Sequence, residues 1–331
     1  MSRARGEFDV IAALFASLAR NAPGALGLRD DAASFDVGPG RDAVITVDTV
    51  IESVHFLPDD PPEAVARKAL RVNLSDLAAK GAEPIGFLQA LSVNSTITDA
   101  YLEAYAGGLA ADVAHFNVPL LGGDTTSGPG PLSVSITAIG AVPKGRMILR
   151  GGARPGDALC VSGTIGDAAL GLSFLRGALK ISRERAAHLV DRYRLPQPRL
   201  AAGLALRGHA SAAVDISDGL IADVAHICAA SNVAAIIDQA ALPLSESAQV
   251  AVGLDKTLWT NILGGGDDYE LAFTLPQGEL GSLSRFCEAA GVPLSVIGRI
   301  VDRESARLGA VTVLDGAGKP IEVSVTGYRH R

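Results

Sequence analysis

The sequence predicts an α+β protein built from two domains. The chain has 331 residues, of which 48% are hydrophobic, and a chain of this length and composition can bury a sizeable core in each domain. Stretches with helical apolar spacing are interspersed with alternating stretches rich in Val, Ile and Thr, which are typical of strands. A turn-rich connector at Pro143–Gly156 divides the chain, so we expect domains at residues 1–143 and 144–331.

Charge and cysteine content exclude several classes of protein. The formal net charge of −7 argues against a surface for nucleic acid or for an anionic membrane. The N-terminus lacks the apolar stretch of a signal peptide, and no run of about 18 apolar residues occurs, so we expect a soluble, cytoplasmic protein. Cys160, Cys228 and Cys287 are odd in number and far apart, which predicts reduced core residues.

The most informative helix is expected from Pro62 to Gly81. Proline suits the first turn, and glycine suits the C-terminal cap. At about 100° per residue, Asp76 falls on the apolar stripe with Asn73 nearby, whereas the basic residues lie on the opposite side. A carboxylate on such a stripe is costly to desolvate. Asp76 therefore needs a partner, which is either a hydrogen bond or salt bridge in the core, or a bound cation.

Other polar groups precede this helix. The adjacent carboxylates of Asp30-Asp31 repel each other, so they either point into water or share a cation. Ala43–Ile51 alternates as a strand does, which places Thr46 and Asp48 on one face. His55 follows in a loop, where a lone histidine is more often structural than functional.

A segment of small residues, Gly122-Gly123-Asp124, follows a short apolar stretch. We expect a strand that runs into a turn here. Paired glycines would let backbone N–H groups approach a phosphate, and Asp124 would hold its metal ion. A plain turn without a ligand fits the same residues.

The second domain carries further acidic motifs. Asp215 and Asp218 lie where a strand meets a helix, and capping of the helix explains Asp218 but not Asp215. Asp267 lies in a glycine-rich loop before a strand expected at Leu271–Leu275. Arg150, in the connector, either faces solvent or clamps a phosphate.

These carboxylates point to one chemistry. Oxygen ligands without Cys or His in the same motifs predict a hard cation, with Mg²⁺ the first choice. If half of the carboxylates converge, a single ion cannot neutralise them, which favours several ions bound with a polyphosphate, and hence phosphoryl transfer or other ATP-dependent chemistry. No P-loop or Rossmann glycine motif occurs. The carboxylates are Asp30, Asp31, Asp48, Asp76, Asp124, Asp215 and Asp218.

Taken in order, these motifs resemble the thiamine-monophosphate kinases, a family in the superfamily of aminoimidazole ribonucleotide synthetase. The resemblance spans nearly the whole chain, and it is specific because the motifs occur jointly. They are Gly6-Glu7-Phe8, Asp30-Asp31-Ala32-Ala33, Asp48-Thr49, His55-Phe56, the run from Asn73 to Gly81, Gly122-Gly123-Asp124-Thr125-Thr126, Asp215-Ile216-Ser217-Asp218-Gly219-Leu220 and Asp268-Tyr269-Glu270-Leu271.

The resemblance implies direct transfer of the γ-phosphate of ATP onto the phosphate of thiamine monophosphate, with several Mg²⁺ ions and no general base. It also implies two α/β domains and a homodimer in which the N-terminal sheets of two chains close into a barrel. The metal ligands that it implies are Asp31, Thr46, Asp48, Asp76, Asp124, Asp215 and Asp218, with Val47 through its backbone carbonyl. It implies ATP contacts from Gly122, Gly123, Asp124, Arg150 and Ser217, and contacts to the thiamine phosphate from His55, Asp267 and Tyr328.

Three positions depart from the family pattern. Arg29 stands where the family has glycine, Asp267 where it has glutamate, and Arg331 where it has phenylalanine. Within the superfamily, aminoimidazole ribonucleotide synthetase matches less well in motif detail. Selenophosphate synthetase and the hydrogenase-maturation relative need a cysteine near the N-terminus or the C-terminus, respectively, which this chain lacks. A non-catalytic relative is the alternative from another class, and it predicts ATP binding without turnover.

Overall fold

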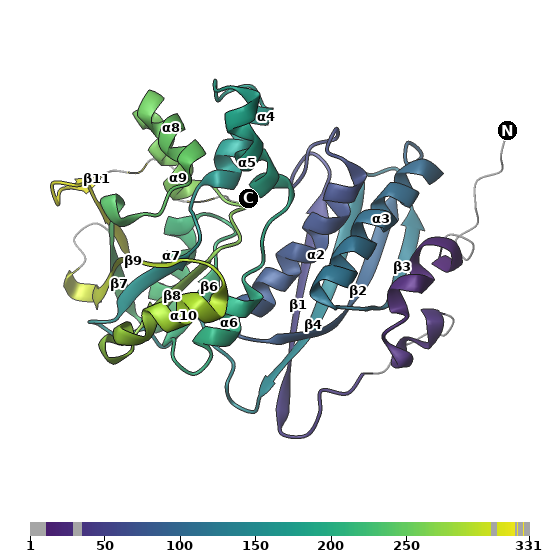
Figure 1. Ribbon diagram of the computed structural model, residues 1–331, viewed down its shortest axis with the longest axis horizontal. Helices are drawn as coiled ribbons and strands as arrows, with labels where there is room; N and C mark the ends of the chain where they lie inside the picture. Colours follow the sequence, from purple (N-terminus) through teal and green to yellow (C-terminus); the bar gives the residue numbers. More distant parts are fainter. Residues whose placement is uncertain (1–10, 29–34, 306–309, 322, 324–326, 328–331) are drawn as a thin grey trace. The chain divides into compact units, whose positions relative to one another are not determined.

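The computed structural model describes the chain except residues 1–10, 29–34, 306–309, 322, 324–326 and 328–331 (Figure 1). The chain divides into two units, Met1–Leu77 with Glu83–Gly145, and Ala78–Ala82 with Arg146–Arg331. Within the described residues, no helix has both the length and the apolar character needed to cross a membrane.

The first unit is a four-stranded sheet with its two long helices, α2 (Pro62–Ala79) and α3 (Asp99–Phe116), on one face (Figure 1). Its strand order is β1-β4-β2-β3, in which β4 is antiparallel to β1 and β2, and β2 is parallel to β3. On β2, Phe87 and Leu91 are buried, whereas Leu88 and Ala90 are exposed on the other face. The described elements are η1 (Ile11–Phe15), η2 (Ala16–Ala19), η3 (Pro23–Leu28), β1 (Arg41–Ile51), α2 (Pro62–Ala79), β2 (Glu83–Val93), α3 (Asp99–Phe116), β3 (Leu120–Ser127) and β4 (Ser133–Pro143).

Helix α2 is buried on more sides than its apolar stripe predicts. Its expected range is confirmed, and the chain turns at Gly81, whose φ of 63° is left-handed. Lys68 and Arg71, two of the basic residues opposite the stripe, are buried as well, because each has a partner. Lys68 donates to the carbonyl of His55 at 2.9 Å, and Arg71 pairs with the buried Asp112 of α3. Contacts between elements, rather than local spacing, bury this side of the helix.

The second unit is a seven-stranded mixed sheet in the order β11-β10-β7-β9-β5-β8-β6. Its strands are β5 (Ala158–Ser162), β6 (Ala212–Asp215), β7 (Val233–Asp238), β8 (Leu271–Leu275), β9 (Leu294–Asp302), β10 (Val311–Leu314) and β11 (Pro320–Ile321). Its helices are α4 (Asp167–Leu175), α5 (Arg183–Arg194), α6 (Leu200–Leu206), α7 (Leu220–Ser231), α8 (Glu246–Leu254), α9 (Trp259–Gly264) and α10 (Leu283–Ala290), with short 3₁₀ turns η4 (Gln239–Ala241), η5 (Lys256–Leu258), η6 (Gln277–Ser282) and η7 (Arg303–Ser305).

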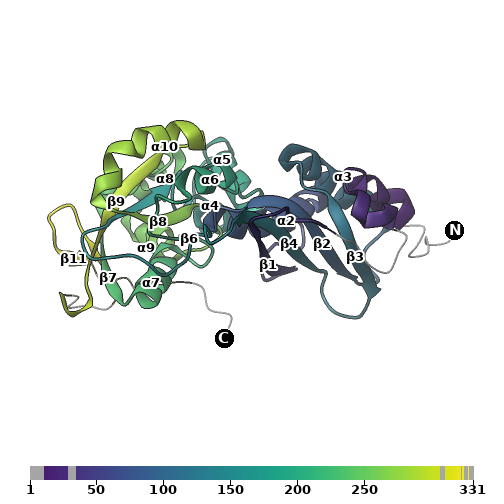
Figure 2. The ribbon, with the colours of Figure 1, turned by 90° about the horizontal axis from the view of Figure 1, so that it is seen from below.

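Helices cover both faces of this sheet, and Figure 2 shows α10 and α7 on opposite sides of it. Successive residues of β5 therefore enter different cores: Leu159 packs with residues of α4, α5 and α7, and Cys160 packs with residues of α6 and α10. The sequence is accordingly apolar throughout this strand. All three cysteines are free, and Cys160 and Cys228 are buried, as expected.

Candidate active site

In the first unit, strand β1 and helix α2 bring three of the predicted residues together. The Thr46 hydroxyl donates a short hydrogen bond to the Asp76 carboxylate. The backbone N–H of Asp48 donates to the side-chain oxygen of Asn73 at 3.0 Å, and the Asn73 amide donates to the carbonyl of Ala69 at 2.9 Å. The partner that the sequence requires for Asp76 is thus a hydroxyl on the neighbouring strand.

Val47 lies between these residues on β1, but its side chain points to the opposite face. Its side chain is 62% exposed, as expected for a strand in which successive side chains alternate. At this position only the backbone carbonyl is available to a ligand on the face of Thr46 and Asp48.

Gly122, Gly123 and Asp124 lie within strand β3, so the prediction of a turn is wrong. In the parallel register Gln89 faces Gly123, and a Cβ atom at Gly123 would lie 2.1 Å from the Gln89 carbonyl oxygen. Glycine is needed here because the neighbouring backbone is so close. Asp124 is exposed on β3, which is an edge strand of its sheet.

His55 is held by the loop that follows β1. Its Nδ1 accepts a hydrogen bond from the backbone N–H of Ile51 at 3.1 Å, which places the proton of the neutral ring on Nε2. The buried Lys68 ammonium donates to the His55 carbonyl. The histidine is therefore structurally fixed, with the ring proton on Nε2.

In the second unit, Asp215 ends β6, and Ser217 and Asp218 lie in the turn between β6 and α7. The backbone N–H groups of residues 217, 218 and 219 all donate to one oxygen of Asp223, at 3.0, 3.0 and 3.1 Å. Asp223 thus holds the turn that precedes α7, and because the N-cap of this helix is Gly219, with no side-chain capping hydrogen bond, the capping explanation for Asp218 is wrong. Asp223 is a site residue that we did not predict from the sequence, although a carboxylate in the first turn of a helix is a recognisable signal.

The turn is also bonded to the loop that carries Asp267. The N–H of Asp267 donates to the Ser217 carbonyl at 2.9 Å, and the N–H of Tyr269 donates to the Ile216 carbonyl at 2.8 Å. A Cβ atom at Gly266 would lie 2.1 Å from the Ser217 oxygen, so this close approach requires glycine. The fold thereby brings together Asp215, Ser217, Asp218 and Asp267, which are far apart in the sequence.

The carboxylates of Asp215, Asp218 and Asp223 lie close together at this turn. Burial, followed by the nearby Asp215 and Asp218, raises the pKa of Asp223 to about 8. Oxygen atoms of Asp218 and Asp223 lie within 4.8 Å of each other and of a ring nitrogen of the exposed His226. Excess negative charge and oxygen donors are what a hard cation requires, so these residues fit a magnesium ion. The pair of Thr46 and Asp76 in the first unit has the same type of donor.

Three predicted residues, Arg150, Asp31 and Tyr328, belong to neither of these two groups. Arg150 is exposed, and the preceding Leu149 accepts the backbone N–H of Ala213 on β6 at 2.9 Å. Arg150 therefore lies beside the strand that ends at Asp215. Asp31 and Tyr328 lie outside the described residues.

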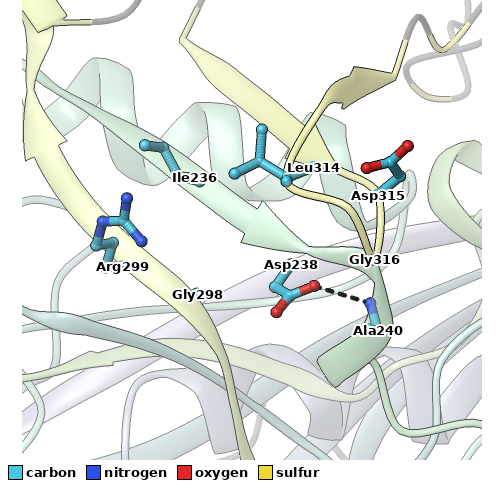
Figure 3. Close-up of a pocket in the computed structure, with 9 residues that line it drawn as sticks. Ile236, Asp238, Ala240, Gly298, Arg299, Leu314, Asp315 and Gly316 are labelled. Carbon is cyan, nitrogen blue, oxygen red and sulfur yellow. Dashed lines mark hydrogen bonds between the residues drawn. The ribbon is translucent and has the colours of Figure 1, made fainter.

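A pocket of about 180 Å³ in the second unit contains none of the predicted residues (Figure 3). The side-chain oxygen of Asp238 accepts the Ala240 N–H at 3.0 Å, and one oxygen of Asp315 accepts the N–H groups of Ala317 and Lys319. Because these carboxylates stabilise local turns, we assign the pocket no role. Its lining residues are Ile236, Asp238, Ala240, Gly298, Arg299, Leu314, Asp315, Gly316 and Gly318.

Comparisons with known proteins identify the family. Residues 29–142 match the family described as AIR synthase related protein, N-terminal domain, and residues 154–310 match the corresponding C-terminal domain. A thiamine-monophosphate kinase of Caulobacter vibrioides is 46% identical over 90% of this chain and 85% of that protein. The chain belongs to the thiamine-monophosphate kinase family.

Solved structures of the family extend the similarity to the fold. A thiamine-monophosphate kinase from Stenotrophomonas maltophilia K279a is 39% identical, with a TM-score of 0.81 over 92% of this chain and 94% of that chain. A complex of AaThiL with AMPPCP and TMP is 29% identical, with a TM-score of 0.76 over 100% of this chain and 99% of that chain. Both comparisons support the two-domain α/β fold that the family resemblance implies.

Proposed function

We infer that this member of the family transfers the γ-phosphate of ATP to the phosphate of thiamine monophosphate, forming thiamine diphosphate. The observation that carries the inference is the match over 100% of the chain to a family structure solved with AMPPCP and TMP. AMPPCP is an analogue of ATP, so that protein was solved with an ATP analogue and TMP bound together. The 46% identity to a kinase of this name supports the same reaction.

We propose that carboxylates of both units hold Mg²⁺. In the first unit, Thr46 orients Asp76 by its hydrogen bond. In the second unit, carboxylate oxygens of Asp218 and Asp223 lie within 4.8 Å of each other. When bound, the ions would neutralise phosphate charge and align the reacting groups. The proposed ligands are Asp31, Thr46, Val47, Asp48, Asp76, Asp124, Asp215 and Asp218.

We further propose which residues bind the two substrates. His55, with its fixed Nε2 donor, suits a phosphate oxygen of thiamine monophosphate, and the exposed Arg150 suits a phosphate of ATP. The proposed ATP residues are Gly122, Gly123, Asp124, Arg150 and Ser217, and the proposed thiamine phosphate residues are His55, Asp267 and Tyr328. No general base is required, since a phosphate monoester with a second pKa of about 6 is largely a dianion at neutral pH.

We propose that the chain forms a homodimer through the first sheet. Val47 of β1 and Leu88 of β2 both face Thr137 of β4 in the register, so they lie in one row across the sheet, and their side chains are 62% and 38% exposed. An exposed apolar row on a sheet face favours burial against a second copy, which supports pairing of two sheets into a barrel. Sedimentation of the purified protein tests the dimer, and a monomer at all concentrations would contradict it.

The reaction is tested by measuring ADP formation from ATP and Mg²⁺ with and without thiamine monophosphate. We expect thiamine monophosphate to stimulate ADP release, with thiamine diphosphate identified by chromatography in equal amount. Nucleotide binding without turnover would instead support a non-catalytic relative.

A further inference from the structure

The loop that carries Asp267 has an unusual backbone. Asp267 and Tyr269 have φ values of 72° and 51°, both in the left-handed region. Residues other than glycine seldom adopt this conformation, and it persists where the surroundings hold it in place. Two such residues within three positions therefore require specific anchors.

The first anchor is Glu270, which is fully buried and bound by two arginines. Arg192 of α5 donates to one carboxylate oxygen at 2.9 Å, and Arg199, just before α6, binds both oxygens in a bidentate pair. The Ser162 hydroxyl donates to Glu270 at 2.6 Å and accepts the N–H of Leu271 at 2.8 Å. The start of β8 is thus fixed through its side chain and its backbone.

The second anchor is Asp268, which lies between the two left-handed residues and is 1% exposed. Its carboxylate accepts the backbone N–H groups of Gly166 and Ala168 at the start of α4, at 2.6 and 3.3 Å. Its carbonyl accepts Nη2 of Arg192 at 3.0 Å. The same nitrogen of Arg192 therefore connects the Asp268 backbone to the Glu270 carboxylate.

A purely stabilising ion pair does not explain this arrangement well. A buried ion pair is weak evidence for stability, because desolvation of both charges opposes their attraction. Here the guanidinium contacts a backbone carbonyl as well as a carboxylate, on either side of Tyr269. Its geometry fixes the conformation of the loop, and this conformation directs the Asp267 N–H to the Ser217 carbonyl.

We propose that Arg192, acting through Asp268 and Glu270, is a positioning residue that sets Asp267 against the Ser217-Asp218 turn before substrate binds. The proposal rests on the role inferred above for Asp267 in binding thiamine monophosphate. Arg192 does not touch the substrate in this proposal. If the loop is already ordered, binding does not cost the conformational entropy of ordering it. The contacts of Arg192 therefore strengthen the binding of thiamine monophosphate.

The test compares Arg192→Lys with the matched variant Arg185→Lys, which changes an exposed arginine of the same helix. Lysine keeps the charge, but its ammonium group ends a flexible stem and does not reproduce the fixed position from which Nη2 contacts both acceptors. We expect the KM for thiamine monophosphate to rise at least about ten-fold in Arg192→Lys, with the KM for ATP within about two-fold. We expect no change in Arg185→Lys.

Hydrogen exchange of the ligand-free protein gives a second readout. The amides of Asp267 and Tyr269 should exchange at least about ten-fold faster in Arg192→Lys, because the loop opens locally. Unchanged exchange, or equal rises in both KM values, would overturn the proposal. If Arg192→Lys does not fold, Ser162→Ala loosens Glu270 more gently and must show the same pattern, with smaller changes.

The role of Asp267 is tested separately by Asp267→Ala. If this variant keeps its KM for thiamine monophosphate, the assigned substrate contact fails, whereas the exchange measurement still decides whether Arg192 holds the loop. If both assignments are correct, adding Arg192→Lys to Asp267→Ala causes little further rise in KM, because both changes remove the same contact.

Discussion

The two units hold their candidate site residues in different ways. In the first unit, Asp76 and Asp48 lie on a regular helix and a regular strand, where the Thr46 hydroxyl contacts the Asp76 carboxylate and the Asn73 side chain contacts the Asp48 backbone. In the second unit, Asp218 and Asp267 lie on a turn and a loop. The buried carboxylates of Asp223 and Asp268 hold these segments through hydrogen bonds to backbone N–H groups. A regular helix or strand by itself fixes the direction of a side chain, whereas an irregular segment needs buried polar anchors.

The largest effect is expected for Asp76→Asn, which probes the first unit. The amide keeps the shape of the side chain but removes the charge that would bind Mg²⁺, so kcat should fall at least about 100-fold. Thermal unfolding should change little, because Asp76 has only partial burial and one hydroxyl partner. Asp59→Asn, at an exposed position before α2, is the control. Substantial residual activity would refute the metal role.

Asp223→Ala probes the second unit, where we expect stability to change. The substitution leaves three backbone N–H groups of the turn without their acceptor, so the free energy of unfolding should fall by about 2–4 kcal/mol. Denaturant titration measures this change, with the exposed Asp302→Ala as control. A loss of less than about 0.5 kcal/mol would show that the turn does not depend on its buried anchor.

Gly123→Ala tests whether the regular elements of the first unit tolerate added volume. The new methyl group would meet the Gln89 carbonyl, so the edge strand must shift, and we expect a loss of about 1–3 kcal/mol on thermal or chemical unfolding. Gly128→Ala adds the same group just after β3, where no atom lies within 4 Å. Equal stability of the two variants would contradict the close approach of β3 to β2.

The smallest effect concerns the pH dependence of the second unit. A hydrogen bond that His188 donates to the buried Asp167 carboxylate raises the pKa of His188. A raised folded pKa means that the pair stabilises the fold fully below the unfolded pKa of about 6.5, and that this contribution is lost as the pH rises through the folded value. Because the His188 side chain is 50% exposed, the contribution should be at most about 0.5 kcal/mol.

The measurement is thermal unfolding at pH values from about 5.5 to about 8.5, around the ordinary histidine pKa. The loss of stability across this range should be smaller in His188→Gln than in the wild-type protein. His115→Gln, at an exposed position of α3, should behave as the wild type. An identical pH profile for His188→Gln and the wild type would show that the pair of His188 and Asp167 does not stabilise the fold.

The sequence alone predicted the regular elements of the first site well. Proline at the start and glycine at the end located α2, and strand alternation placed Thr46 and Asp48 on one face. These signals are local, since they depend on caps and on the repeat of a helix or strand. The acidic motifs were visible for the same reason, and the family resemblance that they carry was confirmed by the comparisons.

Only the tertiary structure decided which segments are turns and what holds them. The Gly122-Gly123 pair lies in a strand because β2 approaches it, and Glu270 is bound by arginines 78 and 71 residues earlier in the chain. No local repeat connects residues at such separations, so neither propensity nor periodicity can pair them. Burial then makes the pairing specific, because a carboxylate without partners in the core is far too costly.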